Sequence, residues 1–348
     1  MTGWYRETET ILLEVASAIQ QHQPISLTRL ESVATSLVSS LQATDELLLE
    51  ALSGPSGSPV ITNLLNVGIL GTKVGLGLGY YGQELNRLAL SGLLHDIGLF
   101  TIPTSVVAKV GRLTTEERAS IEQHPEYGYQ LILSCGPSYQ WLARIVRQAH
   151  ERVNGEGYPN RLKGQDISEM AMILGVVDVF DALISDRPYR NRLFPHEAVK
   201  EILLAERMRF PREIQKALIE QLSVYPLGSI VRLTTDAVGT VVKTNTRYPT
   251  RPVVQLNQPI IHHGQEIRRI DLSCTPLITI VEVIRRSVVG STRIAAPPPE
   301  AKTGLLQGSA SDQFTALLEN LDAVAGSIQH AVNTRVSLRG QSRSGETA

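Results

Sequence analysis

Residues 91–103 read SGLLHDIGLFTIP, and the histidine-aspartate pair inside this stretch, His95-Asp96, follows an apolar run that ends at Leu94. Imidazole and carboxylate groups are common ligands of divalent metals. The pair alone has a second interpretation, because it could also be a solvated or capping pair at the end of a helix. The choice between the two depends on which other ligand-type residues the chain carries.

Further histidines and carboxylates follow downstream, in His124-Pro125, in His150-Glu151 and in the segment VVDVFD at residues 176–181. A carboxylate in so apolar a run, here Asp178, is costly to bury unless it is paired, hydrogen-bonded or bound to a cation. Asp181 lies three residues further on and shares a helix face with Asp178, so one could bind a metal while the other supports it. A simple capping or supporting contact fits Asp181 equally well.

Apolar residues recur at helical spacing through most of the chain. The pattern predicts helices at residues 11–19 and 27–52, and again through residues 60–225. Thr114 and Glu117 form a capping-box pattern, which predicts a helix that starts there and leads toward His124. The fold class is therefore mainly α.

The character of the sequence changes after Pro226. Short β-branched runs separated by turn residues predict strands at residues 229–233, 239–244, 252–256, 270–272 and 277–284. A Pro-, Gly- and Ser-rich linker and an apolar helical stripe that begins at Phe314 follow. We expect an N-terminal helical region at 1–58, a helical domain at 59–226, a small β extension at 227–286, a linker at 287–312 and a tail helix at 313–338.

Composition restricts the possible functions. With 42% hydrophobic and 19% charged residues the 348-residue chain has the makeup of a globular protein, and its net charge of -1 gives no reason to expect a nucleic-acid polymer as partner. Two distant cysteines predict neither a disulfide framework nor a cysteine metal site. Residues 60–81 are the most apolar segment, but Asn63, Asn66 and Lys73 interrupt it, so we expect a cytoplasmic protein without a membrane span.

Taken in order, the motifs resemble those of the HD-GYP family, a group of metal-dependent phosphohydrolases that hydrolyse cyclic di-GMP. The resemblance covers about residues 60–225 and includes His95-Asp96-Ile97-Gly98, Ile102-Pro103, His124-Pro125, Gly157-Tyr158-Pro159, Asp178 to Ala182 and Arg187-Pro188-Tyr189-Arg190. It implies an HD-domain helical bundle. A β region that begins near Leu227 resembles an extension that often follows such domains.

The resemblance also implies a role for each matching residue. Asp96 would bridge two divalent metals, iron or manganese, and take part in catalysis; His95 and Asp178 would bind one metal, and His124 and His150 the other. Substrate contacts would come from Tyr158, Arg187 and Arg190, since arginine forks suit phosphate oxygens. Asp181 and Glu151 would support the metal ligands.

Three positions depart from the family pattern. Asn63 stands where a first metal-binding histidine is usual, Ala149 replaces the first member of a usual histidine pair, and Leu99 replaces a lysine near the scissile phosphate. These losses favour a cyclic di-GMP signalling protein with weak or lost phosphodiesterase activity. Its metal occupancy would be reduced, or the metal would be absent. We expect it to signal through a homodimer or through a partner bound at the N-terminal or tail helices.

Other interpretations remain. The surviving ligands favour an active cyclic di-GMP phosphodiesterase as the alternative. A phosphohydrolase for another nucleotide is disfavoured by the intact Gly157-Tyr158-Pro159 motif. The pattern GLGLGYYG at residues 75–82 contains a GxGxxG match, but no strand precedes it, so we expect a turn or close helix packing there.

Overall fold

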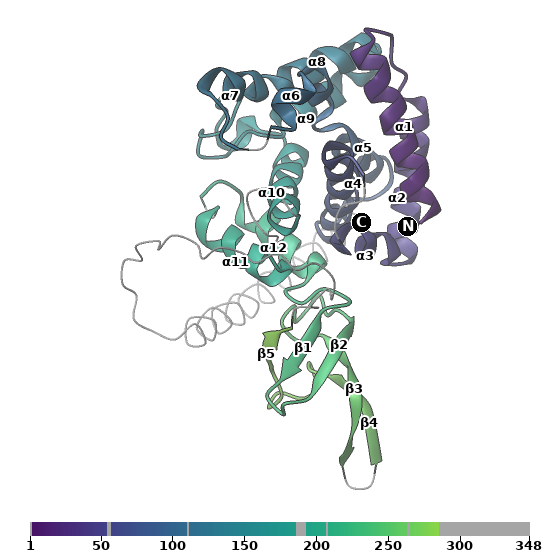
Figure 1. The fold of residues 1–348 in the computed structure, drawn as a ribbon, viewed down its shortest axis with the longest axis vertical. Helices are drawn as coiled ribbons and strands as arrows, with labels where there is room; N and C mark the ends of the chain where they lie inside the picture. The colour runs from purple at the N-terminus through teal and green to yellow at the C-terminus, as the bar shows by residue number, and fades with distance from the viewer. Residues whose placement is uncertain are drawn as a thin grey trace, which may run out of the picture. The chain divides into compact units, whose positions relative to one another are not determined.

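The computed structural model describes residues 2–53, 57–109, 111–185, 193–206, 208–262 and 265–284. The chain divides into two compact units, Met1–Gly228 and Ser229–Ala348 (Figure 1). The described part of the first unit is helical, and that of the second is a small antiparallel sheet. The expected mainly α fold with a β appendage is confirmed. The expected linker and tail helix lie outside the described residues.

Three helices precede the central bundle: α1 (Gly3–Gln20), α2 (Thr28–Ala43) and α3 (Glu46–Ser53). Thr2 caps α1, because its hydroxyl accepts a hydrogen bond from the backbone N–H of Tyr5. One face of α1 is buried, including Tyr5, Leu12 and Ile19. Within the first unit α1 contacts α2, α4 and the short helix η1, so the N-terminal helices pack directly on the bundle.

The centre of the first unit is the helix pair α4 (Pro59–Gly77) and α5 (Gly82–Leu94). The two helices pack closely, because a Cβ atom on Gly92 would lie 2.8 Å from the Cα of Gly68. The GxGxxG match falls at the turn between them, as expected for close packing or a turn. By length and composition α4 could cross a membrane, but 72% of its most apolar window is buried within the protein, as in a core helix.

The remaining elements of the first unit follow in chain order: η1 (Ile97–Thr101), α6 (Thr104–Val107), α7 (Thr115–Glu122), α8 (His124–Ser134), η2 (Pro137–Tyr139), α9 (Gln140–Gln148), η3 (Gly164–Asp166), α10 (Glu169–Ile184), α11 (Pro195–Ala205) and α12 (Arg212–Leu222). The capping box at Thr114 and Glu117 is confirmed. The helix it starts ends at Glu122, and a new helix, α8, begins at His124.

The second unit is a five-stranded sheet of β1 (Ile230–Leu233), β2 (Val238–Lys243), β3 (Val253–His262), β4 (Gln265–Asp271) and β5 (Ile280–Val283), in the order β4-β3-β2-β1-β5. All neighbouring strands are antiparallel. Strands β3 and β4 extend beyond the expected ranges. Ile260 to His262 pair only with β4, and the polar residues next to them interrupt the β-branched pattern from which the strands were predicted.

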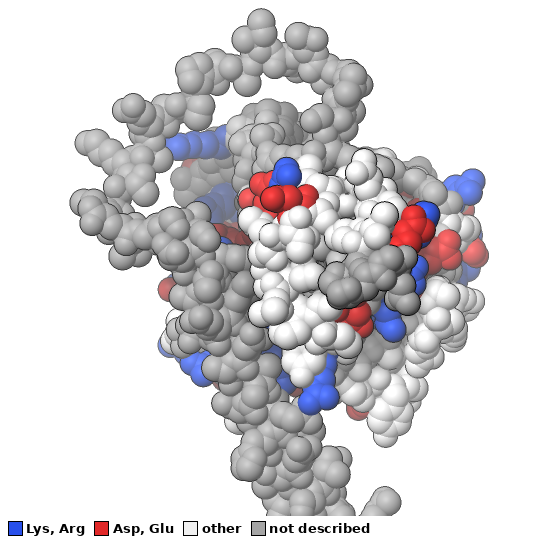
Figure 2. All heavy atoms as spheres, turned by 90° about the horizontal axis from the view of Figure 1, so that it is seen from below, with Lys and Arg blue, Asp and Glu red and all other residues white. Residues whose placement is uncertain are grey.

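Charged side chains show no concentration of one sign on the face that Figure 2 displays. Among the described residues on this face, Lys and Arg alternate with Asp and Glu in small groups (Figure 2). This distribution agrees with the near-zero net charge of the whole chain.

Candidate metal centre

Four elements of the first unit bring the predicted ligands together. His95 and Asp96 follow the end of α5, His124 begins α8, His150 follows α9, and Asp178 lies in α10. His95 is fully buried, and Asp96, His124 and His150 are 8%, 2% and 6% exposed. A group of polar side chains buried this deeply requires partners or a bound cation.

The tightest part of the cluster consists of Asp96, His124 and His150. Oδ1 of Asp96 lies 2.7 Å from Nε2 of His150 and 3.1 Å from Nε2 of His124, and the two Nε2 atoms are 2.9 Å apart. One ligand atom from each side chain therefore lies within 4.8 Å of the ligand atoms of the other two. Two imidazoles and a carboxylate that converge on one point form a typical donor set for a divalent transition metal.

Backbone carbonyls orient two of the histidines. Nδ1 of His124 lies 2.7 Å from the carbonyl oxygen of Ile121, and Nδ1 of His95 lies 2.9 Å from that of Gly92. A ring that donates its Nδ1–H to a carbonyl keeps the lone pair of Nε2 available, which is the usual arrangement of a metal-binding histidine. In both residues Nε2 faces the cluster.

Nε2 of His95 is the clearest sign that the cluster suits a cation. It is buried and has no hydrogen-bond partner among the described residues. It lies 3.4 Å from Oδ1 of Asp96 and 3.8 Å from Oδ1 of Asp178, which is too far for a good hydrogen bond. A buried ring nitrogen held between two carboxylates fits a metal ligand, so the residues present fit the metal that the family resemblance implies.

The imidazoles and carboxylates of the cluster shift one another's pKa values. Burial alone would lower the pKa of His95, but Asp96 and Asp178 outweigh it and raise this pKa to about 9. Burial opposes ionisation of Asp96, yet His95, His124 and His150 hold its pKa well below the usual range. Burial lowers the pKa of His150, and the nearby Asp96 offsets only part of that effect. The site is thus arranged to keep its carboxylates ionised next to imidazoles, as metal binding requires.

Two asparagines of α4 hold the carboxylates of α10. Nδ2 of Asn63 donates to Oδ1 of Asp178 at 3.1 Å and to Oδ2 of Asp181 at 2.9 Å, and Nδ2 of Asn66 donates to Oδ1 of Asp181 at 2.8 Å. Asn63 therefore presents hydrogen-bond donors to the site, where a histidine would present a lone pair. Asn66 is not among the predicted site residues, although its spacing of three from Asn63 on an apolar helix is a signal that could have indicated it.

Tyr158 and Glu151 form the wall beside His150. The Tyr158 ring stacks on the His150 ring with centroids 5.0 Å apart and planes at 5°. The buried carboxylate of Glu151 accepts backbone N–H bonds from Asn160 at 2.7 Å and Leu162 at 2.9 Å, so it fixes the loop after Tyr158 and touches no metal ligand through these bonds. Gly157 is required for close packing, because a Cβ there would lie 2.5 Å from the His150 carbonyl oxygen.

The remaining predicted residues are placed as follows. Arg187 and Arg190 lie outside the described residues. Ala149 is buried at the end of α9 and carries no ligand atom on its side chain. Leu99 lies in η1, where its backbone N–H donates to the carbonyl oxygen of Asp96. Its apolar side chain cannot pair with a phosphate.

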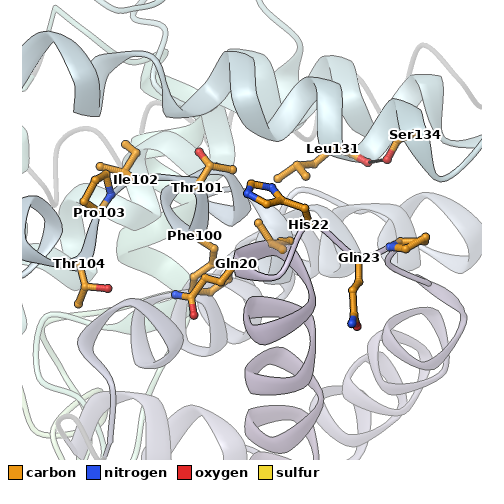
Figure 3. Close-up of a pocket in the computed structure, with 12 residues that line it drawn as sticks. Gln20, His22, Gln23, Phe100, Thr101, Ile102, Pro103, Thr104, Leu131 and Ser134 are labelled. Atoms are coloured by element: carbon orange, nitrogen blue, oxygen red, sulfur yellow. Dashed lines mark hydrogen bonds between the residues drawn. The ribbon is translucent and has the colours of Figure 1, made fainter.

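A separate cavity of about 750 Å³ lies between the end of α1, the segment from Phe100 to Thr104 and α8 (Figure 3). Figure 3 shows His22, Gln20 and Thr101 among the side chains around it. None of the predicted ligands lines this cavity. The cavity is therefore distinct from the metal centre.

Comparison with known proteins places these features in context. Residues 63–214 match the family model described as HD domain, and residues 230–291 match a KOW domain associated with HD domain. A solved structure of an HDG"Y"P protein from Bdellovibrio bacteriovorus has the same fold, with a TM-score of 0.52, 18% sequence identity and coverage of 62% of this chain and 69% of that one. The helical bundle expected from the motifs is confirmed.

Three curated relatives are named as cyclic di-GMP phosphodiesterases. One from Pseudomonas aeruginosa is 34% identical over 49% of this chain and 41% of its own length. The response regulator RpfG of Xanthomonas campestris pv. campestris is 39% identical over 38% of this chain and 35% of its own length, and a protein of Thermotoga maritima is 34% identical over 44% and 42%. The chain thus spans less than half of each of these relatives.

Proposed function

Because this chain carries an HD domain similar to those of cyclic di-GMP phosphodiesterases, we propose that it is a metal-binding cyclic di-GMP signalling protein whose phosphodiesterase activity is weak or lost. The observation that carries the proposal is the convergence of Asp96, His124 and His150 on one buried point. This donor set supports metal binding. The three departures from the family pattern lie around the same site and support reduced turnover.

Hydrolysis of a phosphodiester requires attack of a water oxygen on phosphorus, cleavage of the bond to the leaving ribose oxygen, and a proton for that oxygen. A bound divalent metal supplies Lewis acidity and lowers the pKa of a metal-bound water. Asp96, His124 and His150 would hold the metal. His95, whose Nε2 lies 3.4 Å from Oδ1 of Asp96 and 3.8 Å from Oδ1 of Asp178, would be a further ligand together with Asp178. Tyr158 stands beside His150, where its ring can contact a substrate base.

Three observations support weakened chemistry. The amide N–H groups of Asn63 bond to Asp178 and Asp181, so this amide nitrogen serves the carboxylates and binds no metal. Ala149 contributes no ligand and Leu99 contributes no charge. Loss of a single group that stabilises the transition state typically costs about a hundredfold or more in rate, so three such losses act in the same direction.

An active phosphodiesterase is the second candidate. It is favoured by the buried Nε2 of His95, because this nitrogen lies between the carboxylates of Asp96 and Asp178, next to the Asp96–His124–His150 cluster. Water can fill the coordination positions that Asn63 and Ala149 leave, since metal ions accept water as a ligand.

A hydrolysis assay separates the two candidates. The full chain, loaded with iron or manganese, is incubated with cyclic di-GMP alongside Asp96→Asn and the triple variant Asn63→His/Ala149→His/Leu99→Lys. We expect binding of cyclic di-GMP with slow or no turnover, and a rise of about a hundredfold or more in the triple variant. Rapid turnover by the unmodified chain that Asp96→Asn abolishes would establish the active enzyme instead.

A further inference from the structure

The helix α1 lies outside the matched HD domain, which begins at residue 63. It is nevertheless firmly attached to the first unit. The backbone N–H of Thr2 donates to the Glu50 carboxylate of α3 at 3.0 and 3.1 Å, and the Thr2 hydroxyl donates to it at 2.7 Å. Nε1 of Trp4 donates to the carbonyl oxygen of Val33 in α2 at 2.9 Å. These bonds fix the first turn of α1, and Tyr5 lies in that turn.

A chain of hydrogen bonds leads from Tyr5 to the metal centre. The Tyr5 hydroxyl donates to Oδ1 of Asn66 at 3.5 Å, the long limit for a hydrogen bond, and Nδ2 of Asn66 donates to Asp181 at 2.8 Å. Asp181 accepts from Asn63 at 2.9 Å, and Asn63 also donates to Asp178 at 3.1 Å. Tyr5, Asn66 and Asp181 are each 3% exposed or less, so water has little access to the two bonds that join these three side chains.

The direction of each bond is fixed by the chemistry of its members. An asparagine side chain has one acceptor oxygen and one donor nitrogen, and the Asp181 carboxylate can only accept when ionised. The Asp181 carboxylate therefore selects the amide orientation of Asn66 that presents the nitrogen to it, and the Tyr5 hydroxyl stabilises this orientation by donating to the amide oxygen. The opposite orientation would place the amide oxygen against the carboxylate, with no proton between them.

The end of the chain is a predicted metal ligand. The Asp178 carboxylate lies between two imidazoles, with Oδ1 3.8 Å from Nε2 of His95 and Oδ2 3.9 Å from Nδ1 of His150. A small rotation of this carboxylate would bring it closer to one of these imidazoles and further from the other. It would also move the oxygen atoms that could bind a metal. Asn63 restricts that rotation, and its own orientation depends on Asp181.

We propose that Tyr5 is a positioning residue of the metal centre, which acts on Asp178 through Asn66, Asp181 and Asn63. The proposal rests on the proposed function in so far as Asp178 binds the metal. It makes the N-terminal helix a working part of the site, so that a displacement of α1 reaches the metal ligands through a continuous series of hydrogen bonds.

The expected effect follows from the length of the chain. Residues that orient metal ligands from outside typically change metal affinity by about 10- to 100-fold when mutated. Asn66 is one step closer to the site than Tyr5, and the bond between them is long. We therefore expect Asn66→Ala to lower metal affinity by about tenfold or more and Tyr5→Phe by a smaller factor, about threefold to tenfold.

The test is a Co²⁺ titration of the full chain, with affinity and the visible absorption spectrum as readouts. Tyr5→Phe is compared with Tyr80→Phe, which removes a tyrosine hydroxyl that bonds to Glu169 of α10, outside this chain of hydrogen bonds. We expect weaker binding and an altered spectrum for Tyr5→Phe, and neither change for Tyr80→Phe. Thermal melting of the metal-free proteins separates a loss of fold from a change at the site.

A double-variant comparison makes the outcome decisive. If Tyr5 acts through Asn66, then Tyr5→Phe changes Co²⁺ affinity and spectrum in the wild-type background and changes neither in Asn66→Ala. Equal effects in both backgrounds, or wild-type affinity and spectrum in Tyr5→Phe, would overturn the proposal. Failure of the unmodified chain to bind Co²⁺ would instead contradict the proposed function itself, so the two failures differ.

Discussion

His95 shows how one side chain joins the electrostatics of the site to its proposed chemistry. Its imidazole is fully buried, its Nδ1 faces the Gly92 carbonyl, and its Nε2 lies between the carboxylates of Asp96 and Asp178. The carboxylates overcome the effect of burial and raise the pKa of His95 to about 9. In the absence of metal the ring therefore carries a proton at neutral pH, and a metal must displace it.

The raised pKa makes the stability of the metal-free protein depend on pH. Because the folded pKa of His95 lies above the ordinary value, its contribution is complete below about pH 6.5 and is lost as the pH rises through about 9. In urea denaturation with a chelator, we expect the urea concentration at the midpoint of unfolding to decrease in the wild type as the pH is raised from about 6.5 to about 9. In His95→Gln this midpoint should decrease less. Equal decreases in the two proteins would show that His95 does not carry the effect.

The residues of the site differ in how far sequence reveals them. The order and type of the motifs predicted five metal ligands: His95, Asp96, His124, His150 and Asp178. The structure brings these five side chains together. The motifs do not predict roles for Tyr5 and Asn66, because these roles depend on the contact between α1 and α4. The residues next to Tyr5 and Asn66 in the sequence do not encode this contact.

Among the elements, the contact between η1 and α8 decides whether Asp96 and His124 can meet. η1 follows Asp96 directly and packs against the start of α8. A Cβ on Gly98 would lie 1.9 Å from the carbonyl oxygen of His124 and 2.7 Å from the backbone nitrogen of Gly128. Only glycine allows the two backbones to approach so closely.

We expect Gly98→Ala to separate η1 from α8 and to weaken both the fold and metal binding. Overpacking of this kind typically costs about 1–3 kcal/mol in the free energy of unfolding. Gly3→Ala is the matched control, since a Cβ on Gly3 meets nothing within 4 Å. Denaturant unfolding and a metal titration measure the two effects. Unchanged stability and metal affinity in Gly98→Ala would refute this account of the contact.

Sequence patterns predicted most elements of the first unit and missed one boundary that matters. The capping box predicted α7. Pro125, in the first turn of α8, is a sequence signal for the boundary between the two helices, but it was not used to predict one. The new start of α8 at His124 places the His124 imidazole where its Nδ1 faces the Ile121 carbonyl and its Nε2 faces Asp96. That arrangement arises from tertiary packing, which local propensity does not describe.

At the scale of the whole molecule, the chain consists of a helical unit and a sheet unit with a boundary after Gly228. The change in sequence character after Pro226, where β-branched runs replace helical periodicity, predicts a boundary two residues before this one. The full length of β3 and β4 was not predicted from the sequence. The outer part of their hairpin carries polar residues, which do not pack against a core and so do not show the apolar pattern of a strand.

Since all the candidate ligands lie in the helical unit, we expect a chain that ends at Gly228 to fold and to bind metal as the full chain does. Circular dichroism would report the helical content, and a titration with Mn²⁺ would report the affinity. A more than tenfold loss of affinity in a folded, shortened chain would show that the second unit contributes to the site.

The metal content of the purified chain tests the central claim most directly. After reconstitution with iron or manganese and removal of excess metal, elemental analysis of the wild-type protein should find at least one ion per chain, and Asp96→Asn should retain far less while remaining folded. A wild-type chain that holds no metal, or an Asp96→Asn variant that holds as much as the wild type, would contradict the claim that Asp96, His124 and His150 form a metal centre.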